Sequence, residues 1–116
     1  MTANVIVKES KRGGRGVFAR KAIPKGTLFL QDPIIYVTEK DCPNYIYADH
    51  DKIFIGCGPS SLINHSELHE NVYWVSDFFT NEKLPVIKFY ALRDIKAGEE
   101  LLHNYQWDSK YKGFIE

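Results

Sequence analysis

The sequence FARKAIPKG at Phe18–Gly26 returns as YALRDIKAG at Tyr90–Gly98. Both copies place an aromatic residue, an alanine, a basic residue, an isoleucine and a glycine at the same spacing, and an apolar run follows each copy, at Thr27–Leu30 and at Leu101–Leu102. A strand that ends, an isoleucine that enters the core and a glycine at a tight turn explain this pattern. We therefore expect two similar strand–turn–strand units packed in one fold.

The rest of the chain is also dominated by strand-like runs. These runs are short, rich in β-branched and aromatic residues, and bounded by Gly, Pro, Asn or Asp. The spacing leaves no room for repeated crossover helices, so we predict a mainly β fold of several small, mostly antiparallel sheets. Brief helical turns are expected only near Pro43–Asp49 and Ser60–Ile63. The predicted strands are Val5–Val7, Val17–Ala19, Thr27–Leu30, Ile34–Val37, Ile53–Ile55, Val72–Val75 and Val86–Leu92.

The bulk composition describes one ordinary domain of 116 residues, with 44% hydrophobic and 26% charged side chains. No apolar run approaches the ~20 residues of a membrane span, and no signal-peptide core follows the polar start, so we expect a soluble protein of the cytoplasm or nucleus. Cys42 and Cys57 lack zinc-type spacing. They are either free thiols or a single bridge, and free thiols fit a reducing compartment better.

Charge is unevenly spread although the formal net charge is zero. The first 30 residues carry seven basic side chains and only Glu9 as an acid, whereas residues 31–82 carry nine acids and two lysines. A basic end suits phosphate or carboxylate, and an acidic middle suits a basic peptide. Solvated surface of either sign is the simpler interpretation of charge alone.

The first candidate for chemistry is the loop Arg12-Gly13-Gly14-Arg15-Gly16, which precedes a predicted strand. Glycines allow close backbone approach and leave amide groups free to hold an anion. The loop matches neither the dinucleotide nor the P-loop pattern. Taken alone, it is more often an ordinary hairpin turn.

The second candidate is Asn64-His65-Ser66, which follows the apolar pair Leu62-Ile63. Asn and His present both donors and acceptors to a heterocycle or to backbone. His65 and His69 are four residues apart, but no third ligand lies near them in sequence, so we predict no metal site. Taken alone, the triplet predicts a partly buried histidine with its hydrogen bonds satisfied.

The third candidate is the segment Gly98–Tyr105, which contains Glu99 and Glu100. Adjacent residues of a strand face opposite sides, so these glutamates are not expected to act as a pair on one substrate. Tyr105 ends the apolar run, and Trp107 follows it closely. Such aromatic clusters are usually core and rim packing.

Together, the order and spacing of these three segments resemble the SET-domain protein lysine methyltransferases. The likeness spans about residues 5–107, which is nearly the whole chain. It implies a single SET domain over residues 1–116, with residues 108–116 as a short C-terminal tail. It also implies a C-terminal pseudoknot, in which the segment that ends at Tyr105 passes beside the Asn-His-Ser loop. Threaded chains are rare in general, so this topology depends wholly on the resemblance.

The same resemblance implies a cofactor and the residues that hold it. S-adenosylmethionine would be the methyl donor. Gly14, Arg15 and Gly16 would lie along its methionine part, where close backbone approach suits the carboxylate. Asn64 and His65 would hold the adenosine part, with the His65 main chain at the adenine edge.

By resemblance, Tyr105 would be the catalytic tyrosine. Tyr45 and Tyr47 would line the channel for the substrate lysine. His103 occupies a position that is linked in this family to the number of methyl groups added, where many members have Phe or Tyr. Because His103 departs from that pattern, we predict no particular degree of methylation.

The C-terminal region departs from the family pattern. Cysteine-rich zinc segments are absent, so no zinc is expected, and Trp107 is the first of a few aromatics that would close over the cofactor in place of a zinc-bearing tail. A domain this short looks more like viral or bacterial members of the family than like large chromatin enzymes. The small size also suggests a homodimer that completes the peptide groove.

The implied activity is methyl transfer to a lysine side chain of another protein, with histone H3 as a family-level expectation for the basic partner. The alternative is a SET-like interaction module without turnover. A nucleic-acid binder that uses the basic first 30 residues is a more distant alternative, because the acidic middle opposes it and no direct contact with nucleic acid is expected.

Overall fold

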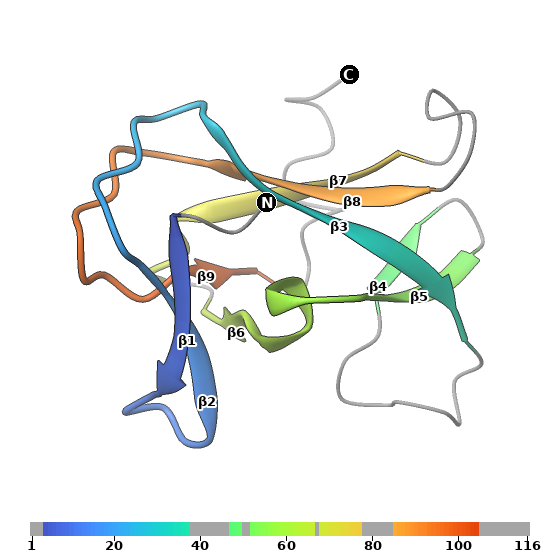
Figure 1. The fold of residues 1–116 in the computed structure, drawn as a ribbon, viewed down its shortest axis with the longest axis horizontal. Coiled ribbons are helices and arrows are strands. Elements are labelled where there is room, and N and C mark those ends of the chain that lie inside the picture. The colour runs from blue at the N-terminus through green and yellow to red at the C-terminus, as the bar shows by residue number, and fades with distance from the viewer. Residues whose placement is uncertain (1–3, 38–46, 50–51, 67, 78–84, 105–116) are drawn as a thin grey trace.

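The computed structural model describes residues 4–37, 47–49, 52–66, 68–77 and 85–104 (Figure 1). Within these residues the chain forms nine strands in three small sheets, with one short 3-10 helix, η1 (Pro59–Leu62). The predicted mainly β fold is confirmed, and so is the brief helical turn near Ser60. The strands are β1 (Val5–Glu9), β2 (Arg15–Ala19), β3 (Leu28–Tyr36), β4 (Tyr47–Asp49), β5 (Lys52–Gly56), β6 (Asn64–His65), β7 (Val72–Asp77), β8 (Val86–Ala91) and β9 (Leu102–His103).

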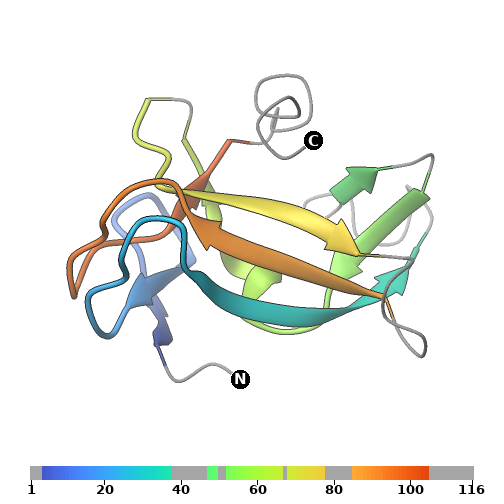
Figure 2. The same ribbon diagram turned by 90° about the horizontal axis from the view of Figure 1, so that it is seen from above.

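The largest sheet has five antiparallel strands in the order β4-β5-β3-β8-β7. Two predicted strands, Thr27–Leu30 and Ile34–Val37, are parts of the single strand β3. Its first part pairs with β8 and its last part, Ile34–Tyr36, pairs with β5. Figure 2 shows the twist of this sheet.

The repeated sequence pattern corresponds to a reciprocal contact in space. Ile23 and Ile95 exchange both backbone hydrogen bonds, each with an N···O distance of 2.8 Å. The two turn glycines behave alike, since the Gly26 amide donates to the Ala91 carbonyl and the Gly98 amide donates to the carbonyl of Ala19, both at 2.8 Å. Both glycines have positive φ, 84° and 91°. The two units therefore pack against each other through equivalent atoms, as the sequence predicts.

The smallest sheet joins two segments that are far apart in the sequence. Strand β6 pairs with β9 in parallel, with Asn64 opposite Leu102 and His65 opposite His103. The Ser66 amide continues the contact by donating to the His103 carbonyl at 3.0 Å. This pairing places the C-terminal segment beside the Asn-His-Ser triplet, as the resemblance implies. The path of the chain from Tyr105 onward lies outside the described residues, so the threading itself stays a prediction.

Asn71 holds β9 from the side opposite β6. Its buried amide donates from Nδ2 to the Glu100 carbonyl at 2.9 Å and accepts from the Leu102 amide at 2.8 Å. Its own backbone amide donates to the Leu102 carbonyl at 2.9 Å. One residue, through its side chain and its backbone amide, therefore takes the place of a neighbouring strand for a segment of three residues.

An aromatic cluster fills the core between the five-stranded sheet and β9. Tyr47 stacks on Phe54 at a ring-centroid distance of 5.9 Å and meets Trp74 and Phe89 edge-on at 5.1 and 6.2 Å. Its hydroxyl donates to the Ser60 carbonyl at 2.7 Å. Paired rings of this kind contribute packing energy beyond the area that they bury.

The predicted helical turn at Pro43–Asp49 is wrong for its last three residues. Residues 47–49 form β4, which pairs with β5 in register Tyr47↔Phe54. Burial of the Tyr47 ring and pairing with β5 outweigh local helix preference, because an isolated helical turn is weakly stable. Residues 43–46 lie outside the described part.

The structure also bears on the expectations about membrane spans and cysteines. No helix in the described ranges is long and apolar enough to cross a membrane. Cys57 is a free and exposed cysteine, which agrees with the interpretation as free thiols. Cys42 lies outside the described residues.

We predict that Asn71→Ala lowers the free energy of unfolding by about 2–4 kcal/mol, because the Glu100 carbonyl and the Leu102 amide lose their partner in a buried place. Urea denaturation of the full chain measures this change. Leu68→Ala is the control: its side chain is 87% exposed, so a change within about 0.5 kcal/mol is expected. Equal effects of the two substitutions would contradict the role given to Asn71.

Candidate functional site

The three candidate segments meet at the carboxylate of Glu100. Asn64 donates from Nδ2 to Glu100 Oε2 at 2.8 Å and to the Arg15 carbonyl at 3.1 Å. Gly16 lies against the same carboxylate so closely that a Cβ atom there would collide with Glu100 Oε2. The glycine at position 16 is therefore required by close approach.

The glycine loop is tied to the same carboxylate through Ser10. The Ser10 hydroxyl donates to the two carboxylate oxygens of Glu100 at 2.9 and 3.0 Å, and it accepts from the Arg12 amide at 3.0 Å. Backbone bonds close the loop on itself, since the Ser10 amide donates to the Gly14 carbonyl and the Gly13 amide donates to the Ser10 carbonyl. The Arg12 guanidinium lies 4.0 Å from the Glu100 carboxylate.

The neighbouring glutamates face different surroundings, as the alternation of a strand predicts. Glu99 pairs with Arg93 at 2.9 Å and accepts from the Lys96 amide at 2.6 Å. The hydrogen bond with Arg93, followed by that with Lys96, lowers the pKa of Glu99. Glu100, by contrast, faces the glycine loop and Asn64. The two carboxylates therefore do not act as an acid–base pair.

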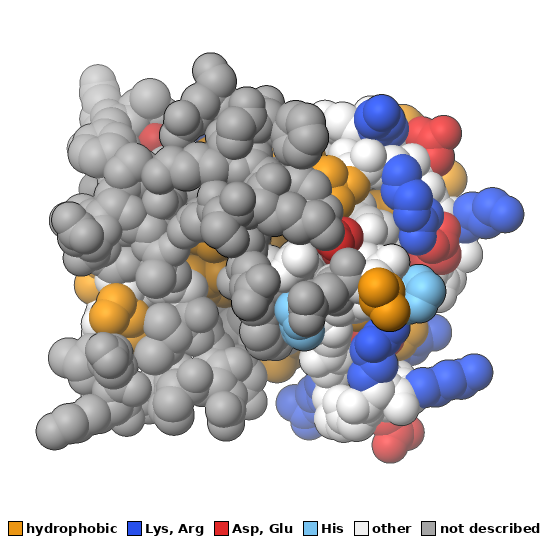
Figure 3. Space-filling view, turned by 180° about the vertical axis from the view of Figure 1, so that it is seen from behind, with side chains coloured by type: hydrophobic (Ala, Val, Ile, Leu, Met, Phe, Trp, Pro, Cys, Tyr) orange, Lys and Arg blue, Asp and Glu red, His pale blue; other side chains and the backbone are white. Residues whose placement is uncertain are grey.

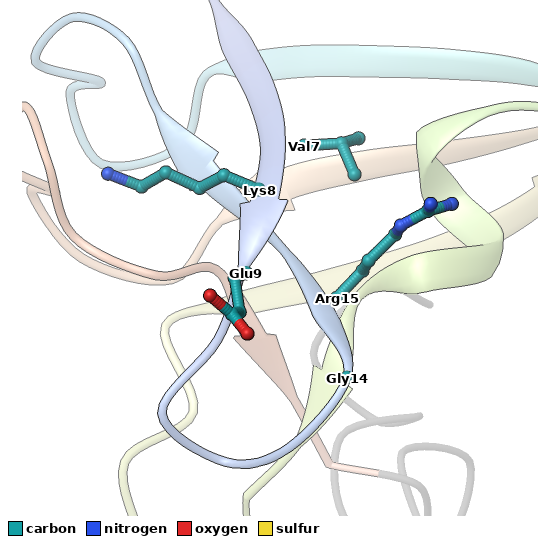
Figure 4. A pocket seen from close by; sticks show the side chains of 5 residues that line it. All are labelled: Val7, Lys8, Glu9, Gly14 and Arg15. Carbon is teal, nitrogen blue, oxygen red and sulfur yellow. The ribbon is translucent and has the colours of Figure 1, made fainter.

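Two open pockets adjoin the loop. One of about 350 Å³ lies against β1 and the start of β2 (Figure 4). The Arg15 side chain and that of Lys8 point to opposite sides of the hairpin in Figure 4, and Lys8 lies 4.6 Å over the Phe18 ring. The other pocket, of about 390 Å³, is lined by Lys11, Arg12, His69, Asn71, Arg93, Glu99, Glu100 and Leu102.

Exposed basic side chains gather at the end of the molecule that carries the hairpin and the two glycine turns (Figure 3). They come from the first 30 residues, as the charge distribution predicts, and from the second repeat unit. The residues are Lys8, Lys11, Arg12, Arg15, Arg20, Lys21, Lys25, Arg93 and Lys96.

His103 is buried among aromatic rings. It is 3% exposed, and its ring centroid lies 5.6 Å from that of Tyr47 and 6.1 Å from that of Phe89. The pKa of His103 is lowered to about 3, mainly by burial and to a smaller extent by the nearby charge of His65, while backbone hydrogen bonds with Asn104 and Ile63 oppose the change. The imidazole is therefore neutral at physiological pH.

The structure brings together several residues that the sequence singles out. Asn64 contacts the segment that contains Gly14, Arg15 and Gly16, although Arg15 offers its carbonyl rather than its side chain. His65 pairs with His103 along the parallel strands. Tyr47 and His103, the predicted channel residues, are neighbours in the buried cluster. The predicted residues Tyr45, Tyr105 and Trp107 lie outside the described residues.

Sequence reasoning missed Ser10, Asn71 and the role of Glu100. Glu100 was excluded only as half of an acid–base pair, and nothing in the local sequence shows that it meets Asn64. Asn71 carries a weak signal: a polar residue directly before the apolar strand β7, where burial requires hydrogen-bond partners.

A mainly β architecture in which a glycine loop, an Asn-His-Ser strand and a C-terminal segment are joined by hydrogen bonds defines a class of domain. The sequence matches the SET domain family over residues 14–106. It is also 31% identical over 110 residues to a Schizosaccharomyces pombe histone-lysine N-methyltransferase specific for lysine 37 of histone H3, over 85% of this chain and 71% of that protein.

Solved structures agree on the fold. A Plasmodium falciparum protein assigned as a histone methyltransferase superposes with a TM-score of 0.78 at 23% identity, over 90% of this chain and 95% of that one. A Chaetomium thermophilum Polycomb repressive complex 2 chain, in a structure bound to S-adenosylmethionine, gives 0.67 at 24% identity, over 92% of this chain and 16% of that one.

The chain belongs to the SET-domain family, a class of S-adenosylmethionine-dependent protein lysine methyltransferases. The resemblance noted from the sequence is thereby confirmed. The expected viral or bacterial subtype stays a prediction.

The residues at the loop fit S-adenosylmethionine. Ideal Cβ atoms at Gly13 and Gly14 would meet no atom within 4 Å, so a ligand can approach the backbone there. The exposed cationic side chains of Lys11, Arg12 and Arg15 suit a carboxylate. When bound, this cofactor supplies an electrophilic methyl group.

We predict that Gly16→Ala weakens binding of S-adenosylhomocysteine at least about 10-fold, because the added methyl group displaces the Glu100 carboxylate and crowds Asn64. Isothermal titration calorimetry measures this affinity. Gly26→Ala is the matched control: its Cβ would meet open space, and its positive φ costs about 1 kcal/mol of stability without touching the loop. Unchanged affinity in a folded Gly16→Ala protein would show that the close contact does not matter.

We predict that stability falls as the pH drops below about 6.5, the usual pKa of an unfolded histidine. Between that value and about 3, the unfolded chain binds a proton that buried His103 does not. Its contribution is up to about 1.4 kcal/mol for each pH unit. His103→Phe should remove this slope in denaturation series from pH 7 to pH 4, and His69→Gln, an exposed control, should keep it. A slope that is the same in both variants would contradict the assignment.

Proposed function

We propose that the chain methylates a lysine of histone H3, with Gly14, Arg15, Gly16, Asn64 and His65 as the cofactor residues. One observation supports this proposal above all others: the glycine loop and Asn64 meet at Glu100, which lies in the segment that ends at Tyr105, five residues before that tyrosine. The proposal extends to Trp107, which would lie against the cofactor as part of the short tail.

In this proposal Tyr105 orients the reacting groups. Transfer of a methyl group from sulfur to nitrogen is an in-line displacement that needs the lysine amine in its neutral form. Free lysine has a pKa of about 10.4, so its proton must leave before reaction, and a dry channel favours that loss. A fixed phenol oxygen then holds the amine and the methyl group in line, roughly 3–3.5 Å apart.

Tyr45, Tyr47 and His103 would line the lysine channel. Tyr47 and His103 lie within the described residues and support this assignment. Their rings are neighbours in the core, and the pKa of His103 is lowered to about 3. A neutral imidazole does not repel an approaching ammonium group. Aromatic faces also tolerate a cationic stem.

Histone H3 is proposed as substrate on two grounds. The Schizosaccharomyces pombe relative bears that specificity in its name. The middle of the chain, residues 31–82, has nine acids against two lysines, which suits a tail rich in lysine and arginine. A homodimer that completes the peptide groove is a further expectation from the size of the domain.

We predict that the wild-type chain transfers labelled methyl from S-adenosylmethionine to lysine in a mixture of core histones. Tyr105→Phe should reduce the rate at least about 100-fold, since loss of alignment at the reacting atoms is costly. Tyr90→Phe is the control; its ring stacks on Tyr73 at 5.2 Å, away from the glycine loop, and its activity should stay near that of wild type.

Three outcomes separate the possibilities. Label on histone H3 that depends on Tyr105 supports the whole proposal. Label on another protein would refute only the substrate. Full activity of Tyr105→Phe would refute the catalytic assignment.

A further inference from the structure

We propose that Glu100 is a positioning residue that sets the shape of the Ser10–Gly16 loop and the orientation of the Asn64 amide, and through both the fit of S-adenosylmethionine. This inference rests on the proposed function, in which the loop and Asn64 hold the cofactor. Nothing in the family resemblance assigned Glu100 a role.

The first step is the loop. Ser10 donates its single hydroxyl proton to the carboxylate of Glu100, which leaves a lone pair for the Arg12 amide. The hydroxyl can serve both partners only in this direction. Since the Ser10 backbone also closes the loop onto Gly13 and Gly14, the carboxylate fixes the loop at its base.

The second step is Asn64. Its Nδ2 group meets a carboxylate oxygen at 2.8 Å and the Arg15 carbonyl at 3.1 Å. Both partners only accept hydrogen bonds, so the amide has one satisfactory orientation. Its two protons are used by the protein, and the Oδ1 atom is turned away from the carboxylate. A donor on a ligand can therefore be met by Oδ1 in a fixed place.

The third step is the state of Glu100 itself. Its side chain is only 14% exposed, and Gly16 packs directly against one oxygen. Ser10 contacts both carboxylate oxygens, Asn64 contacts one of them and the Arg12 guanidinium lies 4.0 Å away, all of which favour the ionised form that these donors require. This geometry fits a Glu100 that positions Ser10 and Asn64 better than a Glu100 that reacts with the substrate itself.

The backbone of Glu100 is held independently of its side chain. Its carbonyl accepts from Asn71 Nδ2 at 2.9 Å, and the residue pairs with Phe18 in an isolated bridge. Removal of the carboxylate should therefore leave the path of the chain intact. This separation makes a positioning role distinguishable from a structural one.

The experiment measures affinity for S-adenosylhomocysteine by calorimetry in the full chain, with melting temperature recorded for each variant. We expect Glu100→Ala to weaken binding about 10- to 100-fold, as befits hydrogen bonds to a charged group. Glu100→Gln should recover part of the loss, because it keeps an acceptor for Asn64. Glu99→Gln is the matched control, since that neighbouring carboxylate contacts Arg93 and Lys96 instead, and it should bind like wild type.

A double-mutant cycle tests whether Glu100 acts through Asn64. In an Asn64→Ala background, Glu100→Ala should cost clearly less affinity than in wild type. Equal losses in both backgrounds, or no loss in a folded Glu100→Ala protein, would overturn the inference while leaving the proposed function standing. If Glu100→Ala is unfolded, the same double-mutant cycle is measured with Ser10→Ala and Glu100→Gln. Equal losses of affinity in both backgrounds would then overturn the inference. Failure of the wild-type chain to bind S-adenosylhomocysteine would instead count against the proposed function.

Discussion

The structure depends on how one short segment, Glu99–His103, satisfies its backbone hydrogen bonds. Among the described residues it forms no hairpin, and its backbone groups are paired by three parts of the chain: the Val17 carbonyl accepts from the Leu101 amide, Asn71 bonds both the amide and the carbonyl of Leu102, and β6 pairs with it in parallel. Buried backbone groups need partners, so these three parts of the chain must converge on the segment. The glycine loop and the Asn-His-Ser strand are thereby brought together from distant parts of the sequence.

This convergence explains why the candidate site is built largely from backbone and small residues. Gly16 must lack a side chain because the Glu100 carboxylate occupies the space beside it. The Asn64 side chain donates a hydrogen bond to the Arg15 carbonyl, and the Ser10 hydroxyl joins the loop to the Glu100 carboxylate. The proposed cofactor contacts are therefore inseparable from the contacts that hold the fold, and small displacements of one would alter the other.

Local sequence predicts those parts of the fold that local chemistry determines. Strand runs, the turn near Ser60 and the repeat built on Ile23 and Ile95 follow from residue type and spacing. The two-residue pairing of β6 with β9 does not, because its stability comes from contacts some 40 residues apart along the chain. The same limit applies to the site: the family resemblance implies that the glycine loop and Asn64 hold the same cofactor, whereas the role of Glu100 is visible only from its contacts with Ser10 and Asn64 in space.

Hydrogen–deuterium exchange of the full chain, with and without S-adenosylhomocysteine, tests the convergence most directly. If the three segments form one ligand site, the ligand should slow amide exchange in residues 10–17, 63–66 and 100–104. The rate should fall by a similar factor in all three segments. Slowing in only one of these segments, or mainly in β7 and β8, would contradict the account.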